Sequence, residues 1–359
     1  MKKYIFIPSL AFGGAEKVVS SLFKFDAIKK NCDLLLLKDN FQYKVKDCKY
    51  KLMTPFLFLL MVFKRDYSII QCHLVMPLFI GSMLKFFNRS FELQAVHCFS
   101  YDGYLSRRSI LQKELIRYLL KFSQRLVDVH IFKSIDMLDD FKLTFGFFPK
   151  NYEIIHNPVD LSREPNLSKK FDINHLSDKR HVAILGRICR SKGSYDIFKL
   201  AELCDDTFMF HVVGDGIDYK KIAHIAKDYS SVNMYGHLSN PFELVSQCEL
   251  YISLSYNEGF PNALVESMAL GLYPIHSNCK TGPRELLGGS YDYDVPQQTQ
   301  GGFLYPPGDI SSCNSGLNKY LNMCAEDKQT ILKRNKKITK NFEITKILSK
   351  YTSILRIQI

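Results

Sequence analysis

Two glutamates eight residues apart, Glu258 and Glu266, bracket a segment with the composition of a binding site. A short apolar run at 250–254 predicts a strand before them, and Pro261 suits the first turn of a helix expected over 262–270. The backbone N–H groups at the start of such a helix attract anions. Two acids beside an anion site suit a ligand that carries hydroxyls and phosphate together, as a sugar nucleotide does.

A glycine and two basic residues follow the strand expected over 181–185. They are Gly186, Arg187 and Lys192. Cations at the carboxyl end of a strand can neutralise a diphosphate leaving group. A solvated basic loop explains the same residues equally well, so both interpretations stay open at this point.

A pair of glycines, Gly13 and Gly14, lies between the first expected strand, 4–8, and a helix expected over 15–25. Glycines here let the backbone approach a phosphate at a helix start, although a tight turn is the favoured interpretation of a lone pair. The spacing is not G-x-G-x-x-G, so a nicotinamide or flavin site has little support. A further glycine-containing loop, 214–216, is explained equally well by a plain turn.

Two histidines end expected strands in the first half of the chain. His97 follows the strand expected over 93–96, and His73 ends the strand before it. A lone histidine at a strand end is more often packed or hydrogen-bonded than catalytic. His97 gains weight because other loops with suitable chemistry also follow strands, whereas for His73 both interpretations stay open.

Length and composition limit the classes of protein. A chain of 359 residues suggests two domains, and its hydrophobic and charged fractions, 46% and 23%, are those of a soluble globular protein. The longest apolar run, 55–63, is nine residues, far below the roughly 20 that span a bilayer. Ten scattered cysteines without a C-x-x-C pair, and an N-terminus without an export signal, predict a cytoplasmic protein. No cluster of Asp or His in the sequence predicts a metal site.

The positive charge is unevenly distributed. The chain has a formal net charge of +12, and residues 1–160 contain 24 Lys/Arg against 15 Asp/Glu, or +9. A basic half suggests a polyanionic partner, either nucleic acid or anionic lipid. No nucleic-acid motif or basic-aromatic groove pattern is present, so nucleic acid has the weaker case.

Strands and helices alternate twice along the chain, once on each side of a polar stretch at 162–180 that we interpret as a linker. Such alternation is typical of parallel α/β sheets. The sequence therefore predicts an α/β protein with two Rossmann-like domains, 1–160 and 161–340, that face each other across a cleft at the carboxyl ends of both sheets. Residues 341–359 are expected to form a helix that packs back on the N-terminal domain.

The order of these motifs resembles a retaining glycosyltransferase of family 4, with the GT-B fold, over essentially the full chain. Five motifs, each weak alone, carry the resemblance: GGAE at 13–16, NPVD at 157–160, GRICRSKG at 186–193, GDG at 214–216, and Glu258-x7-Glu266 closed by the Gly-x-x-Pro of 271–274. Asn157-Pro158 departs from the Asn-Gly of many members and predicts a stiffer hinge. Residues 281–285 are similar to members that build bacterial surface polysaccharides from UDP-sugars.

The resemblance implies a role for each motif residue. Glu266 would hold the nucleotide ribose and Glu258 would face the donor sugar, with His97 lining the sugar pocket. Arg187 and Lys192 would hold the diphosphate in place of a metal ion. Backbone groups would assist, from Gly13, Gly14, Gly186, Asn262, Ala263 and Leu264. No cofactor is expected beyond the UDP-sugar substrate.

The implied reaction transfers a hexose or N-acetylhexosamine from a UDP-sugar to a lipid-linked glycan, and the implied location is the inner face of the plasma membrane. A helix expected over 104–125 has apolar residues on one face and a basic stripe on another, formed by Lys113, Arg117, Lys121 and Arg125. It could lie on anionic lipid, or it could pack its apolar face on the sheet. A UDP-sugar epimerase of the same fold is the alternative enzyme.

Overall fold

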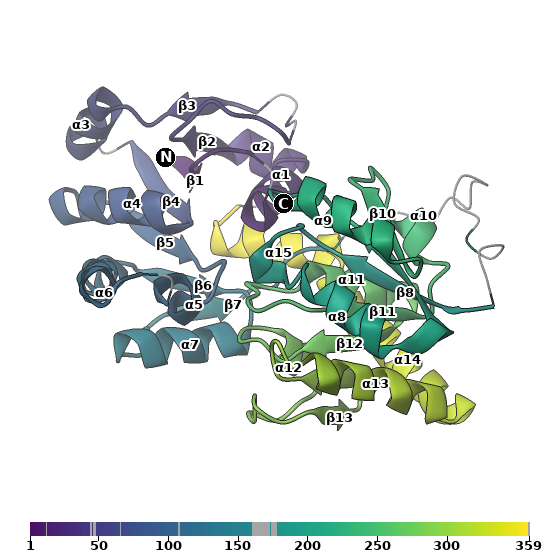
Figure 1. Ribbon diagram of the computed structural model, residues 1–359. Helices are drawn as coiled ribbons and strands as arrows, with labels where there is room; N and C mark the ends of the chain where they lie inside the picture. The colour runs from purple at the N-terminus through teal and green to yellow at the C-terminus, as the bar shows by residue number, and fades with distance from the viewer. Residues whose placement is uncertain are drawn as a thin grey trace. The chain divides into compact units, whose positions relative to one another are not determined.

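The computed structural model describes residues 1–11, 13–43, 45, 48–64, 66–106, 108–159, 173 and 178–357. The chain forms two compact units (Figure 1). Unit 1 comprises Met1–Pro158 and Ile344–Ile359, and unit 2 comprises Val159–Glu343. Each unit contains one seven-stranded sheet with helices on both faces.

The sheet of unit 1 is wholly parallel. Its strands are β1 (Lys2–Ile7), β2 (Cys32–Leu36), β3 (Tyr50–Leu52), β4 (Tyr67–His73), β5 (Glu92–Val96), β6 (Val129–Phe132) and β7 (Tyr152–Ile154). They lie in the order β3-β2-β1-β4-β5-β6-β7. The order reverses between β1 and β4, and open parallel sheets bind ligands beside the carboxyl ends of the strands at such a point.

Helices cover both faces of this sheet, because successive strand residues alternate between the faces. One face packs against α1 (Gly14–Leu22), α2 (Asp26–Asn31) and α15 (Ile344–Ile354). The other packs against α3 (Pro55–Phe63) and α4 (Val75–Phe87). Three further helices enclose an aromatic cluster beside β6, namely α5 (Tyr101–Leu105), α6 (Ile110–Arg125) and α7 (Ile135–Phe145).

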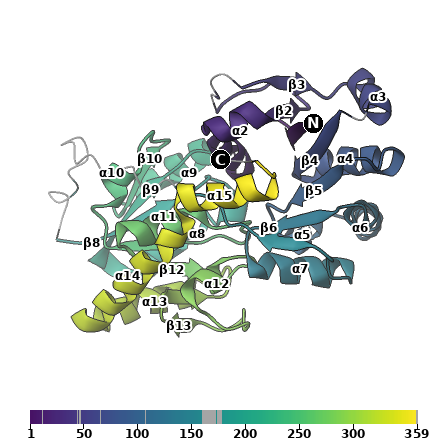
Figure 2. The same cartoon turned by 180° about the vertical axis from the view of Figure 1, so that it is seen from behind.

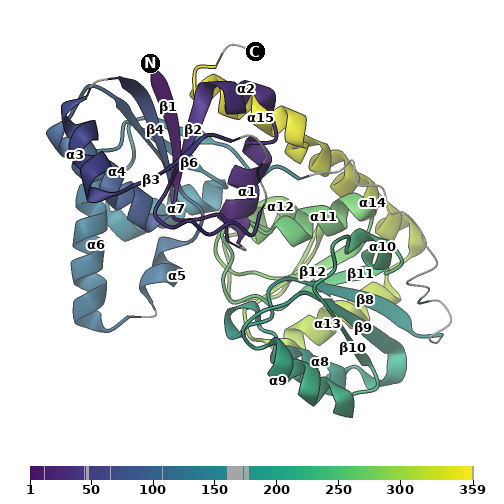
Figure 3. The same ribbon diagram turned by 90° about the horizontal axis from the view of Figure 1, so that it is seen from above.

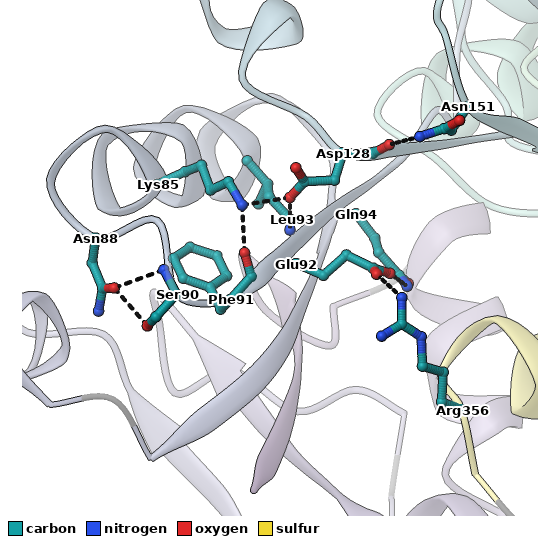
Figure 4. Close-up of polar contacts among 10 residues, drawn as sticks. All are labelled: Lys85, Asn88, Ser90, Phe91, Glu92, Leu93, Gln94, Asp128, Asn151 and Arg356. Carbon is teal, nitrogen blue, oxygen red and sulfur yellow. Dashed lines mark hydrogen bonds and ion pairs between the residues drawn. The ribbon is translucent and has the colours of Figure 1, made fainter.

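The C-terminal helix α15 belongs to unit 1 and lies beside α2 (Figures 2 and 3). Gln94 Nε2 donates to the carbonyl of Ile354 at 2.9 Å. Arg356, just beyond the helix, forms an ion pair with Glu92 of β5 (Figure 4). The last segment of the chain is therefore fixed to the central strands of unit 1.

The sheet of unit 2 is parallel except for one pair of strands. Its strands are β8 (Arg180–Leu185), β9 (Phe208–Val213), β10 (Val232–Gly236), β11 (Leu250–Ser253), β12 (Tyr273–Ser277), β13 (Gln297–Thr299) and β14 (Gly302–Tyr305). They lie in the order β10-β9-β8-β11-β12-β14-β13, and only the β13/β14 pair is antiparallel. The order reverses between β8 and β11, so their carboxyl ends mark the expected binding edge.

The helices of unit 2 divide between its two faces. One face packs against α8 (Asp196–Leu203), α9 (Tyr219–Ile225) and α13 (Ile310–Asn322). The other packs against α10 (Phe242–Val245), α11 (Asn262–Leu270) and α12 (Pro283–Leu287). The last helix of the unit, α14 (Ala325–Thr339), lies against α11.

Two expectations from the sequence need correction or restriction. A continuous helix over 104–125 is wrong, because α5 ends at Leu105 and α6 begins at Ile110 after Ser109 as its N-cap. Most of the expected linker over 162–180, and Asp160 of the NPVD motif, lie outside the described residues. By contrast, the helix expected over 262–270 is confirmed.

Candidate functional site

The loops after β8, β9 and β10 pack directly on one another through their backbones. Gly186 N–H donates to Val213 O at 3.1 Å, and Gly214 N–H donates to Gly236 O at 2.8 Å. Gly214 has a φ of +149°, and a Cβ there would lie 1.7 Å from Gly186 O. No side chain fits at this contact, so the glycines of the 186–193 and 214–216 loops are more than plain turns.

The loop 186–193 is held in turn against the loop that follows β11. Tyr256 N–H donates to Ser191 O at 3.0 Å. Gly193 has a φ of +64°, and a Cβ there would lie 2.1 Å from Leu254 O. These contacts position Lys192, the last residue of a short 3₁₀ turn, beside Glu258.

Lys192 and Glu258 form an ion pair, with 2.5 Å between Nζ and Oε1. The side chains are 28% and 12% exposed, so the charges are partly screened from water. Burial acts to raise the pKa of Glu258, but Lys192, His276 and hydrogen bonds outweigh it, and the net pKa is lowered. Glu258 is therefore a carboxylate at neutral pH, and the sequence-predicted acid and cation act as one unit.

A buried histidine that was not predicted as a site residue contributes to the lowered pKa of Glu258. His276 lies on β12 with no exposed surface, and burial lowers its pKa to about 4. Its Nδ1 lies 2.7 Å from Ser277 O, which makes Nδ1 the protonated nitrogen. Its Nε2 has no hydrogen-bond partner among the described residues. The only sequence signal was a histidine inside an apolar strand, which usually indicates a core residue.

The turn between Glu258 and α11 is fixed by a second loop. Thr281 Oγ1 donates to Glu258 O at 2.5 Å. Gly282 has a φ of +108°, and a Cβ there would lie 2.6 Å from Pro261 Cδ. The segment 281–285 thus braces the backbone that carries Glu258.

The start of α11 offers fewer free N–H groups than the sequence suggested. Asn262 N–H donates to Phe260 O at 2.9 Å, and Leu264 N–H donates to Pro261 O at 3.1 Å. Ala263 N–H shows no hydrogen bond among the described residues. Of the three nominated backbone groups, that of Ala263 is the one available to an anion.

Glu266 lies in α11 and is half-buried. Both Glu258 and Glu266 act on the buried Tyr251, whose pKa is raised by burial and then by the two negative charges. The two acids of the Glu-x7-Glu segment therefore lie near one side chain of β11. Their shared neighbourhood agrees with a single binding site at this edge of the sheet.

Arg187 is exposed and makes no hydrogen bond or ion pair with the described residues. A pocket of about 320 Å³ lies farther along the same loop, lined by Arg190, Gly193, Tyr195, Asp196 and Tyr256. Tyr256 donates from its hydroxyl to Asp196 at 2.7 Å across this lining. This pocket was not predicted from the sequence.

The nominated residues of unit 1 lie in different surroundings. The His97 ring is buried, with Nδ1 2.8 Å from Tyr101 Oη and Nε2 3.1 Å from His130 Nδ1. It also stacks on Phe132. Both nitrogens have partners, so the His97 ring is fixed within unit 1. Its place in a donor-sugar pocket stays a prediction.

His73 ends β4 and is also buried. Its Nε2 lies 3.1 Å from Gln71 Oε1, while Nδ1 has no partner among the described residues. Burial, followed by the charge of Lys133, lowers its pKa well below the usual value. His73 is therefore neutral and held by the core.

Gly13 and Gly14, in the loop after β1, differ in the atoms that surround them. A Cβ on Gly13 would lie 2.1 Å from Glu16 Oε2, so the Glu16 carboxylate folds over the start of α1. A Cβ on Gly14 would meet nothing within 4 Å. The Glu16 side chain is flexible and can move aside, so a close approach of protein atoms requires glycine at neither position.

The described residues contain neither a metal cluster nor a membrane-spanning helix. No three His, Cys, Asp or Glu side chains lie close enough together there to hold a metal ion. No helix in the same residues combines the length and apolar character needed to cross a membrane.

Sequence comparison finds relatives along the chain and a family match over part of it. Residues 166–339 match the family model described as Glycosyl transferases group 1. The N-acetylgalactosamine-N,N'-diacetylbacillosaminyl-diphospho-undecaprenol 4-alpha-N-acetylgalactosaminyltransferase of Campylobacter jejuni is 24% identical over 307 residues, 79% of this chain and 82% of that protein. The lipopolysaccharide 1,6-galactosyltransferase of Escherichia coli K12 is 33% identical over 151 residues, 40% of this chain and 36% of that protein.

Structural comparison covers the whole chain. Anabaena HepE in complex with UDP superposes with a TM-score of 0.82 at 18% identity, covering 99% of this chain and 100% of HepE. The lipopolysaccharide outer core galactosyltransferase WaaB gives a TM-score of 0.69 at 20% identity, with 99% of each chain covered. The expected GT-B fold and glycosyltransferase class are confirmed. The chain is a glycosyltransferase of the GT-B fold, and its residues 166–339 match the model of the glycosyl transferases group 1 family.

Proposed function

We propose that this protein is a retaining glycosyltransferase that moves a hexose or N-acetylhexosamine from a UDP-sugar to a lipid-linked glycan during bacterial surface polysaccharide synthesis. The observation that carries the donor part is the Lys192–Glu258 pair, held at the carboxyl edge of the unit 2 sheet by backbone contacts between loops. Structures of HepE with UDP and with UDP-glucose support a UDP-sugar as the donor.

In this proposal the protein positions charge instead of supplying a nucleophile. The bond between the sugar C1 and the β-phosphate oxygen breaks, and the acceptor oxygen bonds to C1 on the same face. The departing phosphate oxygen takes the acceptor proton. Lys192 and Arg187 stabilise the negative charge that develops on the diphosphate, and no metal ion is required.

The two glutamates take different parts in the donor site. Glu266 accepts hydrogen bonds from the ribose hydroxyls, and Glu258 orients the sugar beside the reacting carbon. Glu258 also sets the position of Lys192 through their ion pair. Because Glu258 stays ionised, its negative charge favours an electron-poor sugar carbon in the transition state.

The proposed class of acceptor is based on the names of the relatives. The names of three Campylobacter jejuni relatives contain an undecaprenol diphosphate, and two further relatives are named lipopolysaccharide 1,6-galactosyltransferases. We therefore propose a lipid-linked glycan acceptor and a place for the protein at the cytoplasmic face of the membrane. Unit 1 is the proposed acceptor-binding unit.

A panel of UDP-sugars, with ADP-glucose as the control, tests the donor. We expect the melting temperature of the purified protein to increase with the concentration of one UDP-sugar, because a ligand that binds the folded state stabilises it. Release of UDP should then require a lipid-linked acceptor, and the product should keep the anomeric configuration of the donor. UDP-sugar turnover without an acceptor would favour the epimerase, and absence of any UDP-sugar effect would overturn the proposal.

A further inference from the structure

Helix α6 has a stripe of apolar side chains that are exposed to solvent. Its buried residues include Leu120, Ser123 and Gln124. On the opposite side Leu111 is 85% exposed and Leu115 is 61% exposed. Tyr118 and Phe122 continue the same stripe, because residues three, four and seven apart share one side of a helix. The apolar face predicted from the sequence is therefore not the face that packs on the sheet.

Helix α3 also exposes apolar side chains, and its composition is more apolar than that of α6. All nine of its residues are apolar, a composition normally found in buried helices. Met61 is buried, yet Phe56, Leu59 and Phe63 are exposed at the three- and four-residue spacing of one helical side. This helix begins at a Pro after the Thr54 N-cap, so its outward side is set by a defined helix start.

Helix α4 lies between the other two and touches both (Figures 1 and 3). Leu78 and Leu84 face the core, whereas Met76, Met83 and Phe87 are exposed. The stripes are joined at the α4/α6 contact, where the rings of Phe86 and Phe122 lie 6.3 Å apart. We call this continuous surface the α3/α4/α6 face.

The α3/α4/α6 face is large. It contains 13 of the 27 exposed large hydrophobic residues that the described part of the chain holds. They are Phe56, Leu59, Phe63, Met76, Met83, Phe86, Phe87, Ile110, Leu111, Leu115, Tyr118, Leu119 and Phe122. Soluble proteins seldom expose apolar residues in such a contiguous group, and patches of this kind mark a binding surface.

The surroundings of the face are basic. Residues 55–125 contain ten Lys/Arg against four Asp/Glu, a net charge of +6, which is half of the +12 of the whole chain. Some of this charge is paired, since Lys85 lies 2.7 Å from Asp128 (Figure 4) and Arg117 bonds to Glu114. Arg125 is exposed and Lys121 partly so on the flank of α6.

We infer that the α3/α4/α6 face lies in the headgroup layer of an anionic bilayer, with its Phe, Leu and Met side chains inserted and its basic residues against lipid phosphates. Exposed apolar stripes flanked by Lys and Arg are the chemistry of interfacial membrane helices. A second copy of the chain fits less well, because joining two such faces would bring together two segments, 55–125 of each copy, that each have a net charge of +6. The inference deepens the proposed function by naming the surface that meets the membrane.

Vesicle co-sedimentation of the full chain tests this inference without substrate. The probes are vesicles of phosphatidylcholine alone and of phosphatidylcholine with phosphatidylglycerol. We expect binding to the anionic vesicles, and Leu111→Ser/Leu115→Ser/Phe122→Ser or Phe56→Ser/Phe63→Ser should weaken it at least tenfold. The control is Leu203→Ser/Ile217→Ser, which removes two exposed apolar residues of unit 2 and should bind like the parent. Circular dichroism melting checks that each variant folds.

The outcomes separate this inference from the proposed function. Equal vesicle binding by the face variants and the control, or no binding by the parent, overturns the inference. A dimer in light scattering that the face variants convert to monomer would assign the face to a second copy and would also overturn it. UDP-sugar stabilisation of the same variants reports on the donor site, so loss of that effect with vesicle binding intact contradicts only the proposed function.

Discussion

Lys192 Nζ lies 2.5 Å from Glu258 Oε1, although 66 positions separate the two residues in the sequence. Each side chain therefore sets the charge environment of the other. A diphosphate that binds Lys192 must either share the ammonium group with Glu258 or break the ion pair between Lys192 and Glu258. The pair links donor binding to the position of the sugar-facing acid.

Lys192→Ala removes the cation of this pair. We expect kcat/KM for the transfer reaction to fall by roughly 10²–10³, because the developing diphosphate charge loses a positioned donor. Steady-state kinetics with the best UDP-sugar measures the change. Lys220→Ala removes an exposed lysine elsewhere in unit 2 and serves as the matched control. A Lys192→Ala enzyme with parental kcat/KM would contradict the proposed role of this lysine.

Glu258→Gln keeps the side-chain shape and removes its charge. Lys192 is then released from its carboxylate partner, so we expect UDP affinity to stay equal or to increase while kcat falls at least tenfold. Calorimetric titration with UDP and single-turnover kinetics separate the two effects. If UDP binding and kcat fall together by the same factor, Glu258 acts mainly by maintaining the fold of the site.

Some glycines in the loops of the donor edge cannot be replaced by other residues, because a Cβ there would overlap backbone atoms of a neighbouring loop. Gly214→Ala would place a methyl group 1.7 Å from Gly186 O, so we expect the unfolding free energy to drop by at least about 2 kcal/mol. Gly14→Ala meets no atom within 4 Å and lies in the first turn of α1, so it should leave stability unchanged or improve it. Urea denaturation of both variants checks the contrast, and equal stability losses would refute it.

Part of this site could be predicted from sequence because its signals are local. Pro261 and the apolar period after it define α11, and the order of the glycine loops identifies the GT-B fold. The partnership of Lys192 with Glu258 could not be predicted, since it depends on how two distant loops meet. The partners of His97 could not be predicted either, because sequence does not show that Tyr101 and His130 lie beside its two nitrogens.

The missed elements have similar physical explanations. β7 and β13 have three residues each, too few to show a period, and no strand was expected at either. The apolar residues of α6 were visible in the sequence, but the same pattern suits a helix on a sheet and a helix on lipid. Only the buried side of Leu120 and the exposed side of Leu111 distinguish the two cases.

Acid should destabilise the protein through buried histidines. Burial lowers the pKa of His130, His211 and His276 to about 4, whereas in the unfolded chain it is about 6.5. Between pH 6.5 and 4 the unfolded chain binds more protons than the folded one. The unfolding free energy should therefore fall as pH is lowered through this window, by up to about 1.4 kcal/mol per pH unit for each histidine.

Urea denaturation at several pH values between 7 and 4.5 measures this slope. His211→Gln should reduce the slope, because one of the groups that protonate only on unfolding is gone. His224→Gln, which changes an exposed histidine of unit 2, is the matched control and should leave the slope unchanged. A pH-independent unfolding free energy over this range would show that these histidines are not held neutral.

A hydrogen bond between Lys133 and Tyr351 joins α15 to β6 and α7 of unit 1, whose connecting segment carries Lys133. The Lys133 amine is 1% exposed, donates to the Tyr351 hydroxyl, and has its pKa lowered by burial to about 8. Tyr351→Phe removes the acceptor, so we expect a loss of about 1–3 kcal/mol in unfolding free energy at pH 7. The loss should be smaller at pH 9.5, because an uncharged amine costs less to bury without a partner. Denaturant curves at both pH values, with Tyr50→Phe as an exposed control, decide whether this buried lysine depends on its hydroxyl partner.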